Sequence, residues 1–145
     1  MSLIIISVGK LKNNFIKELI KDYLKRLNKL KIEFIEIKET NPIKEKEDIL
    51  NKITKIDNKN IFLLSEEGKL LDSYGFTNIL KDSLLNNTNL VFVIGNYYGI
   101  DISLKEKFPI LSLSKMTFTH EIARLLLIEQ IYRAYTIINN LPYHK

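Results

Sequence analysis

A polar loop late in the sequence carries side chains that could hold a small ligand. It offers hydroxyl and ammonium groups at Ser112, Ser114, Lys115 and Thr117. The helix expected to follow would add unpaired backbone N–H groups and the positive end of its dipole. Together these groups could bind an adenine edge or a carboxylate.

The same loop has a simpler interpretation as the capped start of a helix. Thr117 or Thr119 could accept a hydrogen bond from the first helical turn, and Glu121 suits its positive end. Capping does not explain the apolar Met116 and Phe118, which could pack on a flat ring. Both interpretations stay open.

A glycine pair follows the apolar run at residues 90–94. In Gly95-x-x-x-Gly99 neither glycine carries a Cβ, so the backbone could approach a ligand closely. The spacing is not that of a dinucleotide or Walker loop, so phosphate binding is poorly supported. The pattern alone favours a turn over a ligand site.

Metal and hydrolase chemistry are not expected. His120-Glu121 resembles the start of a zinc motif, but position 124 is Arg, and His144 is the only other histidine. The chain has no cysteine and no GxSxG elbow.

The last helix and the tail hold the remaining titratable groups. Glu129 and Arg133 form an i, i+4 pair in the favourable order, within a stripe of apolar residues. They are either a buried ion pair that sets specificity or charges placed near a ligand. His144 has the ordinary pKa best suited to proton transfer near neutral pH, although tails usually fray.

The charge of the chain is unevenly distributed. The net charge is +5, and residues 10–31 hold eight basic side chains against two acidic ones. Such a stripe suits RNA phosphates or is simply a solvated helix face, and charge alone does not decide between them. The candidate RNA-binding residues are Lys10, Lys12, Lys17, Lys21 and Lys25.

Apolar runs and helical stripes alternate along the chain, which predicts an α/β fold with a parallel-rich sheet and helices on both faces. We expect one domain over residues 1–145. Strands are expected at 3–8, 31–37, 60–64, 90–94 and 110–113, and helices at 15–30, 45–56, 73–85, 103–108 and 122–138. A turn is expected at 40–43, a loop at 65–68, and Ser73 as a helix cap. Ligands bind beyond the carboxyl ends of such strands, here after Leu64, Ile94 and Leu113.

The final helix is apolar on nearly all sides, so it is either a central core helix or half core and half subunit interface. We favour a homodimer. No apolar run is long enough to span a membrane, and the N-terminus lacks the features of a signal peptide. A cytoplasmic location is therefore expected.

Several motifs, taken together, resemble those of the ribosomal RNA large subunit methyltransferase H family, a group of SPOUT methyltransferases. They are Val8-Gly-Lys-Leu-Lys12, Leu64-x-x-x-Gly68-Lys69, Phe92-Val-Ile-Gly95, Leu111-Ser-Leu-Ser-Lys-Met-Thr-Phe118-x-His120, Glu129-Gln-x-Tyr-Arg-Ala134 and Tyr143-His-Lys145.

The resemblance implies a C-terminal trefoil knot, a homodimer and S-adenosyl-L-methionine as methyl donor. It implies methylation of N3 of a pseudouridine in the helix 69 loop of 23S ribosomal RNA, within assembled ribosomes. The cofactor positions it implies are Leu64, Gly95, Leu113, Ser114, Lys115, Met116, Thr117 and Phe118. His144 is then the first candidate to assist loss of the N3 proton and Glu129 the second, while Arg133 could stabilise charge on the base. The partner subunit is expected to complete each pocket.

One loop departs from the family's usual Gly-Gly-x-x-Gly. Here Asn96 replaces the second glycine; it could keep the turn by adopting a positive φ. Tyr97 and Tyr98 could stack on a nucleobase or cover the cofactor. Two other functions stay open: a ribosome-binding protein without catalysis, and a SPOUT methyltransferase with another RNA substrate.

Overall fold

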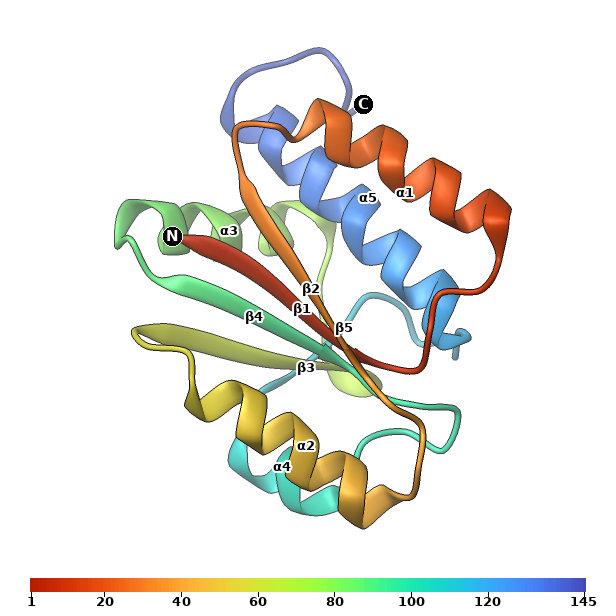
Figure 1. The fold of residues 1–145 in the computed structure, drawn as a ribbon. Helices are drawn as coiled ribbons and strands as arrows, with labels where there is room; N and C mark the ends of the chain where they lie inside the picture. The colour runs from red at the N-terminus through yellow and green to blue at the C-terminus, as the bar shows by residue number, and fades with distance from the viewer.

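A computed structural model describes residues 1–145 and contains a five-stranded sheet in which every paired strand runs parallel (Figure 1). The strand order is β2-β1-β4-β3-β5. The strands are β1 (Ser2–Val8), β2 (Lys31–Ile37), β3 (Lys59–Leu70), β4 (Asn89–Ile94) and β5 (Ile110–Ser112). The predicted α/β class and parallel sheet are confirmed.

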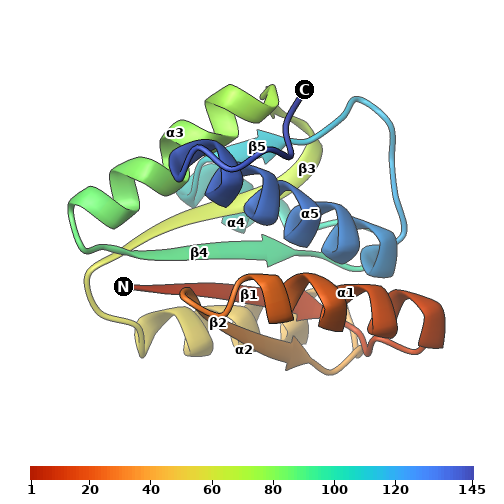
Figure 2. The ribbon, with the colours of Figure 1, turned by 90° about the horizontal axis from the view of Figure 1, so that it is seen from above.

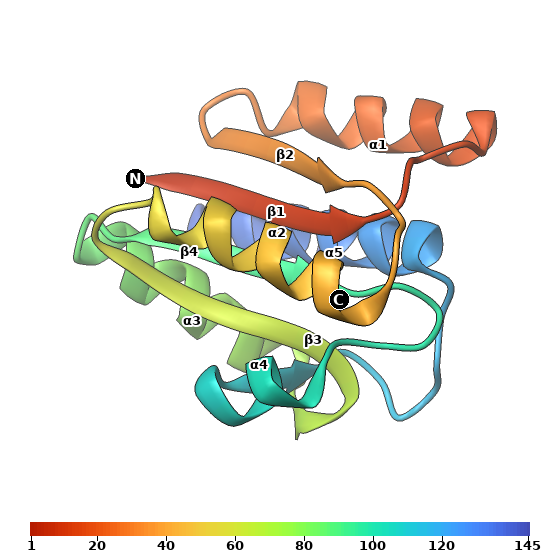
Figure 3. The same cartoon turned by 60° about the horizontal axis from the view of Figure 1, so that its bottom comes forward.

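Helices cover both faces of the sheet, as predicted. One face carries α1 (Asn14–Arg26), α3 (Ser73–Leu85) and α5 (His120–Ile138), with α1 and α5 side by side (Figure 2). The opposite face carries α2 (Pro42–Thr54) and α4 (Ile102–Lys107), which come forward in Figure 3. None of the helices combines the length and apolar character that crossing a bilayer requires.

Successive side chains of β1 join the cores on opposite faces of the sheet, which explains the continuous apolar run of the strand. Leu3 and Ile5 join the core beneath α1, α3 and α5, whereas Ile4 and Ile6 join the core beneath α2 and α4. Successive side chains of a strand point to opposite faces, so a strand covered on both sides must be apolar throughout.

Several helix boundaries differ from the prediction, and two of them differ by three residues or more. α1 ends at Arg26 rather than at residue 30, where the N–H of Leu27 donates to the carbonyls of Tyr23 and Leu24. α2 begins at Pro42 within the expected turn, because Asn41 caps it and proline suits the first helical position.

The expected loop at residues 65–68 is part of β3. Leu64 and Lys69 both pair with Leu111, so the four residues between them bulge out of the ladder. At Gly68 an added Cβ would lie 2.6 Å from the carbonyl carbon of Ile110, so only glycine permits this approach. The Ser73 cap prediction was also wrong: Asp72 caps α3 by accepting from Gly75 N–H at 2.7 Å.

α5 is the middle helix of its layer. It contacts α1 on one side and α3 on the other, and it lies over β1 and β4. Thr119 caps it by accepting from the N–H of Ile122, as one of the two predicted alternatives. The two flanking helices therefore explain much of its apolar circumference within one chain.

Candidate functional site

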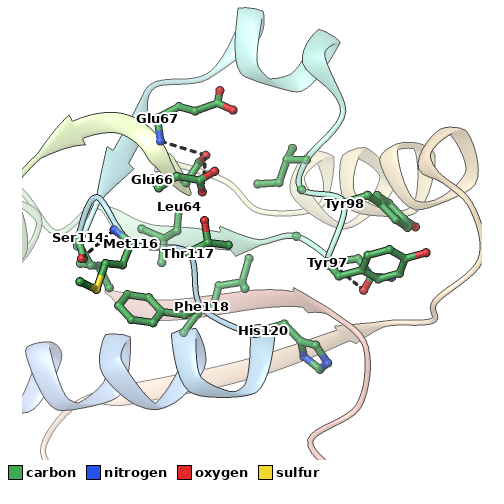
Figure 4. Close-up of a pocket in the computed structure, with 18 of the residues that line it drawn as sticks. Leu64, Glu66, Glu67, Tyr97, Tyr98, Ser114, Met116, Thr117, Phe118 and His120 are labelled. Carbon is green, nitrogen blue, oxygen red and sulfur yellow. Dashed lines mark hydrogen bonds between the residues drawn. The ribbon is translucent and has the colours of Figure 1, made fainter.

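A cavity lies at the carboxyl ends of the strands, at the three strand ends singled out in the sequence (Figure 4). Its walls come from residues 64–67 of β3, residues 94–100 after β4, and the segment between β5 and α5. Its volume is about 240 Å³, slightly below the ~300–1,000 Å³ of most small-molecule sites. A ligand of that class would fill it and extend through its open mouth.

The cavity collects most of the expected cofactor residues. It is lined by Leu64, Gly95, Leu113, Ser114, Met116, Thr117 and Phe118. Lys115 is the exception, since its exposed side chain is not part of the lining. The sequence did not single out Glu66, Glu67, Lys105 and His120 as lining residues, although they also face this space.

Internal hydrogen bonds shape the segment from residue 113 to 118. The hydroxyl of Ser112 donates to the carbonyl of Ser114 at 2.7 Å, and the hydroxyl of Ser114 accepts from Met116 N–H at 3.1 Å. The backbone N–H groups of Thr117 and Phe118 donate to no acceptor within the chain. They are available to ring nitrogens or a carboxylate, beside the half-exposed ring of Phe118.

The Gly95–Gly99 loop is a tight turn. A Cβ at Gly95 would lie 2.6 Å from Ile100 Cγ1 and 2.9 Å from the Gly99 backbone, so the glycine is needed by the chain itself. Gly99 has φ +84 and donates its N–H to the Asn96 carbonyl at 2.7 Å. The positive φ expected at Asn96 does not occur, because Gly99 takes that conformation. The turn interpretation of this glycine pair is therefore the better one.

An ion pair ties the bulge of β3 to α4. Lys105 Nζ lies 3.2 Å from Glu67 Oε2, and both residues line the cavity. In Figure 4 Glu66 and Glu67 stand on the wall opposite Met116 and Phe118. One wall of the cavity thus carries carboxylates, and the facing wall carries apolar side chains.

Arg124, which entered the sequence analysis only as a missing zinc ligand, is a buried cation beneath this site. Only 3 % of its surface is exposed. It donates to Glu36 Oε2 at 3.1 Å, to the Gly9 carbonyl at 3.2 Å, and to the Ser7 hydroxyl. It therefore fastens α5 to the ends of β1 and β2.

Hydrogen bonds lower the pKa of two carboxyl groups near Arg124, those of Glu36 and Glu121. Partial burial alone would raise the pKa of the Glu36 carboxyl, but hydrogen bonds from Leu11 N–H and Arg124 outweigh it and lower that pKa. The N–H of Asn13, followed by that of Lys12, lowers the pKa of Glu121. Glu121 thereby joins the start of α5 to the start of α1.

His120 lines the cavity at the first position of α5. Its Nε2 lies 4.0 Å from Glu39 Oε1, and its buried Nδ1 has no partner within the chain. Gly9, with φ +100, makes room for the imidazole, since a Cβ there would lie 2.9 Å from His120 Cε1.

The three predicted catalytic residues form a separate cluster on the far half of α5. Arg133 lies 2.7 Å from Glu129 Oε1 and 3.0 Å from His144 Nδ1. Tyr143 donates to Glu129 Oε1 at 3.1 Å, and the His144 ring meets the edge of Tyr74. The tail is thus packed on its own helix, whereas the sequence left fraying open.

Burial raises the pKa of the Tyr143 phenol, and hydrogen bonds with Tyr23 and Glu129 raise it further. None of the cluster residues lines the cavity. Glu129 lies nine positions after His120, which is about 13 Å along the helix axis.

The predicted RNA-binding lysines are all exposed. Three of them lie along α1, where Lys21 makes a loose surface pair with Glu18 at 3.6 Å. Lys10 and Lys12 precede α1 at the carboxyl end of β1, next to Gly9 and Glu121. The basic stripe therefore extends from the edge of the site along one helix.

Similarity to known proteins extends over the chain. A family model described as predicted SPOUT methyltransferase matches residues 1–144. A protein named ribosomal RNA large subunit methyltransferase H from Acholeplasma laidlawii is 42 % identical, covering 100 % of both chains. Proteins of the same name from Malacoplasma penetrans and Dictyoglomus thermophilum are 39 % and 40 % identical, covering 100 % and 99 % of each chain.

Proposed function

This chain belongs to the SPOUT methyltransferase family, and we propose that it methylates N3 of a pseudouridine in the helix 69 loop of 23S ribosomal RNA. It is an S-adenosyl-L-methionine-dependent ribosomal RNA methyltransferase. The observation that carries the assignment is full-length similarity to enzymes named for this activity. We propose assembled ribosomes as the substrate, and therefore the cytoplasm as the place of action.

The residues of the cavity fit the methyl donor. S-adenosyl-L-methionine carries a methyl group on a sulfonium sulfur. This methyl group passes from the sulfur to a nucleophile. Phe118 and Met116 offer apolar surface to the adenine, and the free N–H groups of Thr117 and Phe118 suit its nitrogens. Leu64, Gly95, Leu113 and Ser114 complete the proposed binding residues. Lys115 is left out of this proposal because it does not face the cavity.

Methyl transfer asks the protein mainly to position two reactants and to assist loss of the N3 proton. We propose His144 as the first candidate for that proton, with Glu129 as the second. Arg133 contacts both, so it orients them and can stabilise negative charge on the base carbonyls. The three residues therefore act as one cluster.

This cluster can reach a cavity only if a second copy supplies it. Within one chain it lies at the opposite end of α5 from the cavity. Exposed apolar side chains at Phe15, Leu19 and Ile122 lie on α1 and α5, the two helices joined by Glu121. We propose that a homodimer buries them and places the tail of each subunit at the open mouth of the other cavity.

We also propose that the C-terminal segment forms a trefoil knot. β5 pairs with β3 at the sheet edge, whereas α5 lies over β1 and β4. The connection must therefore cross back over the strand ends. Pulling the two termini apart in a single-molecule experiment should give a contour shorter than the ~3.6 Å per residue of a free chain. A full contour would contradict the knot.

Two experiments separate the proposed function from its rivals. Calorimetry with S-adenosyl-L-methionine should show binding; no heat and no thermal shift would favour a ribosome-binding protein without catalysis. Mass mapping of ribosomal RNA from a deletion strain should show loss of the N3-methylpseudouridine. If that mark persists while another disappears, the substrate is a different RNA site, an alternative kept open by the departure at Asn96–Tyr98.

A further inference from the structure

The turn after β4 presents an aromatic side chain that the fold itself does not use. Tyr97 is 88 % exposed, although it follows a buried strand and lines the cavity mouth. A ring left in water contributes little to stability through burial. An exposed aromatic ring at the edge of a cavity is available for contact with a ligand.

The backbone at Tyr97 is hydrogen-bonded although its ring is exposed. Its N–H donates to the side-chain oxygen of Asn96 at 2.8 Å. Asn96 is itself buried and pairs with Gly99 across the turn. Hydrogen bonds therefore hold the turn on both sides of Tyr97, which reduces the ordering needed when the ring meets a partner.

The adjacent Tyr98 anchors the loop. Its ring meets that of Tyr97 edge-on at 4.9 Å between centroids, and it reaches toward the buried Glu45 of α2. Partial burial raises the pKa of the Tyr98 phenol, and hydrogen bonding to Glu45 raises it further. Of the two tyrosines, one packs against the fold and the other is displayed.

The displayed ring does not cover the cavity. In Figure 4 Tyr97 and Tyr98 lie at the end away from Ser114 and Met116, and their rings extend away from those residues. A cofactor lid would be expected to close over the residues from 113 to 118. The exposed ring is instead available to a large substrate that approaches this side of the cavity.

Unpaired RNA loops are recognised by stacking their splayed bases on aromatic side chains, next to cations that hold the phosphates. Lys46 lies in the recess beneath Tyr98, and Lys105, which pairs with Glu67, lines the cavity. We propose that Tyr97 is a stacking platform for an unpaired nucleobase beside the target nucleotide. This inference rests on the proposed function, and it makes Tyr97 a specificity-determining residue of that reaction.

The test is a series of substitutions at residue 97 in the full chain, assayed with ribosomes that lack the modification. Tyr97→Phe and Tyr97→Trp keep a π face, whereas Tyr97→Leu keeps apolar surface without one. We expect the KM for ribosomes to stay within about twofold for Phe and Trp, and to rise about 10-fold for Leu and Ala, the scale of one base–aromatic stack. Leu85→Ala, an exposed change on α3, is the matched control and should leave the KM unchanged.

Binding of S-adenosyl-L-methionine alone separates a platform from a lid. The chain has no tryptophan, so the Tyr97→Trp variant would carry a single indole as a fluorescent reporter. We expect the methyl donor alone to leave the emission of that variant unchanged. We also expect the Kd for the donor to be equal in wild type and Tyr97→Ala. The platform would be overturned if the donor quenched the emission of Tyr97→Trp. It would also be overturned if Tyr97→Ala bound the donor more weakly than the wild type or lost the proposed dimer.

The outcomes keep this inference apart from the proposed function. An active wild type with an unchanged ribosome KM in Tyr97→Ala would overturn the platform alone. Equal KM values for the Leu and Phe variants would also overturn it, since stacking requires the ring. A wild type that binds the donor but transfers no methyl group to ribosomes would overturn the proposed function, and the platform with it.

Discussion

Replacing Arg124 with methionine should be among the most destabilising changes near the site. Arg124 is 3 % exposed and donates to groups on β1 and β2. Breaking a buried ion pair costs about 3–5 kcal/mol when the remaining charge stays buried. The Glu36 side chain is 43 % exposed and can rehydrate, which lowers that cost. The Gly9 carbonyl and the Ser7 hydroxyl lose a donor, at ~1 kcal/mol each.

The sum is a loss of roughly 3 kcal/mol in the free energy of unfolding. For a chain of this size that corresponds to a fall in Tm of about 6–12 °C. The assay is urea unfolding of wild type, Arg124→Met, Glu36→Gln and the double variant. All four are measured at one protein concentration, because association would make stability concentration-dependent.

The double variant should be more stable than the sum of the single losses predicts, by about 1–2 kcal/mol, because neither partner is left unpaired. The affinity for S-adenosyl-L-methionine should also fall in Arg124→Met, since Arg124 holds the carbonyl of Gly9, and Gly9 abuts His120 of the cavity wall. A loss below about 1 kcal/mol together with strictly additive single effects would refute the reasoning.

Three further predictions concern the loop, the helix junction and the basic stripe. Gly95→Ala should lose about 2–3 kcal/mol and most cofactor affinity, because its Cβ meets Ile100 at 2.6 Å. Gly75→Ala, whose nearest neighbours are at 3.3 Å within a helix, should stay within about 1 kcal/mol of wild type by thermal unfolding. The pKa of Glu121 is lower in the folded protein than in the unfolded chain, where it is about 4.3. Glu121 therefore stabilises the fold at a pH above the unfolded pKa, and this stabilisation is lost as the pH falls through the folded pKa. The stability gap between wild type and Glu121→Gln, measured by urea unfolding, should therefore close on acidification; a gap independent of pH would contradict the assignment. Replacing Lys17, Lys21 and Lys25 of α1 by glutamine should reduce the slope of log affinity for ribosomes against log salt by about 2. The control variant, in which Lys52, Lys55 and Lys81 are replaced by glutamine, should keep the slope of the wild type.

Elements fixed by local patterns could be predicted from the sequence. The apolar runs of β1 and β4 require cover on two faces, and the sheet provides it. The amphipathic stripe of α1 and the Thr119 cap are also local signals. Because parallel strands share one carboxyl edge, the three strand ends gave the location of the cavity before any contact was known.

Elements that depend on distant contacts could not be predicted. Residues 65–68 are polar and contain a glycine, and only pairing with β5 makes them part of a strand. The role of Arg124 depends on Ser7, Gly9 and Glu36, which are more than 80 positions away in the chain. A cation inside the apolar stripe of α5 was the one sequence signal that could have indicated it.

The tail illustrates the same limit. Chain ends usually fray, yet Tyr143 and His144 pack on Glu129, Arg133 and Tyr74. No local pattern predicts these contacts, because they join three separate elements. Their distance from the cavity of the same chain is what makes a second subunit necessary in the proposed mechanism.

The most direct test of the central claim is methyl transfer by the purified protein. Ribosomes from a strain lacking the modification are incubated with the protein and S-adenosyl-L-methionine, and the helix 69 fragment is analysed by mass spectrometry. We predict one added methyl group, located at N3 of the pseudouridine and absent when the cofactor is omitted. An unmodified fragment from protein that binds the cofactor and the ribosome would contradict the account.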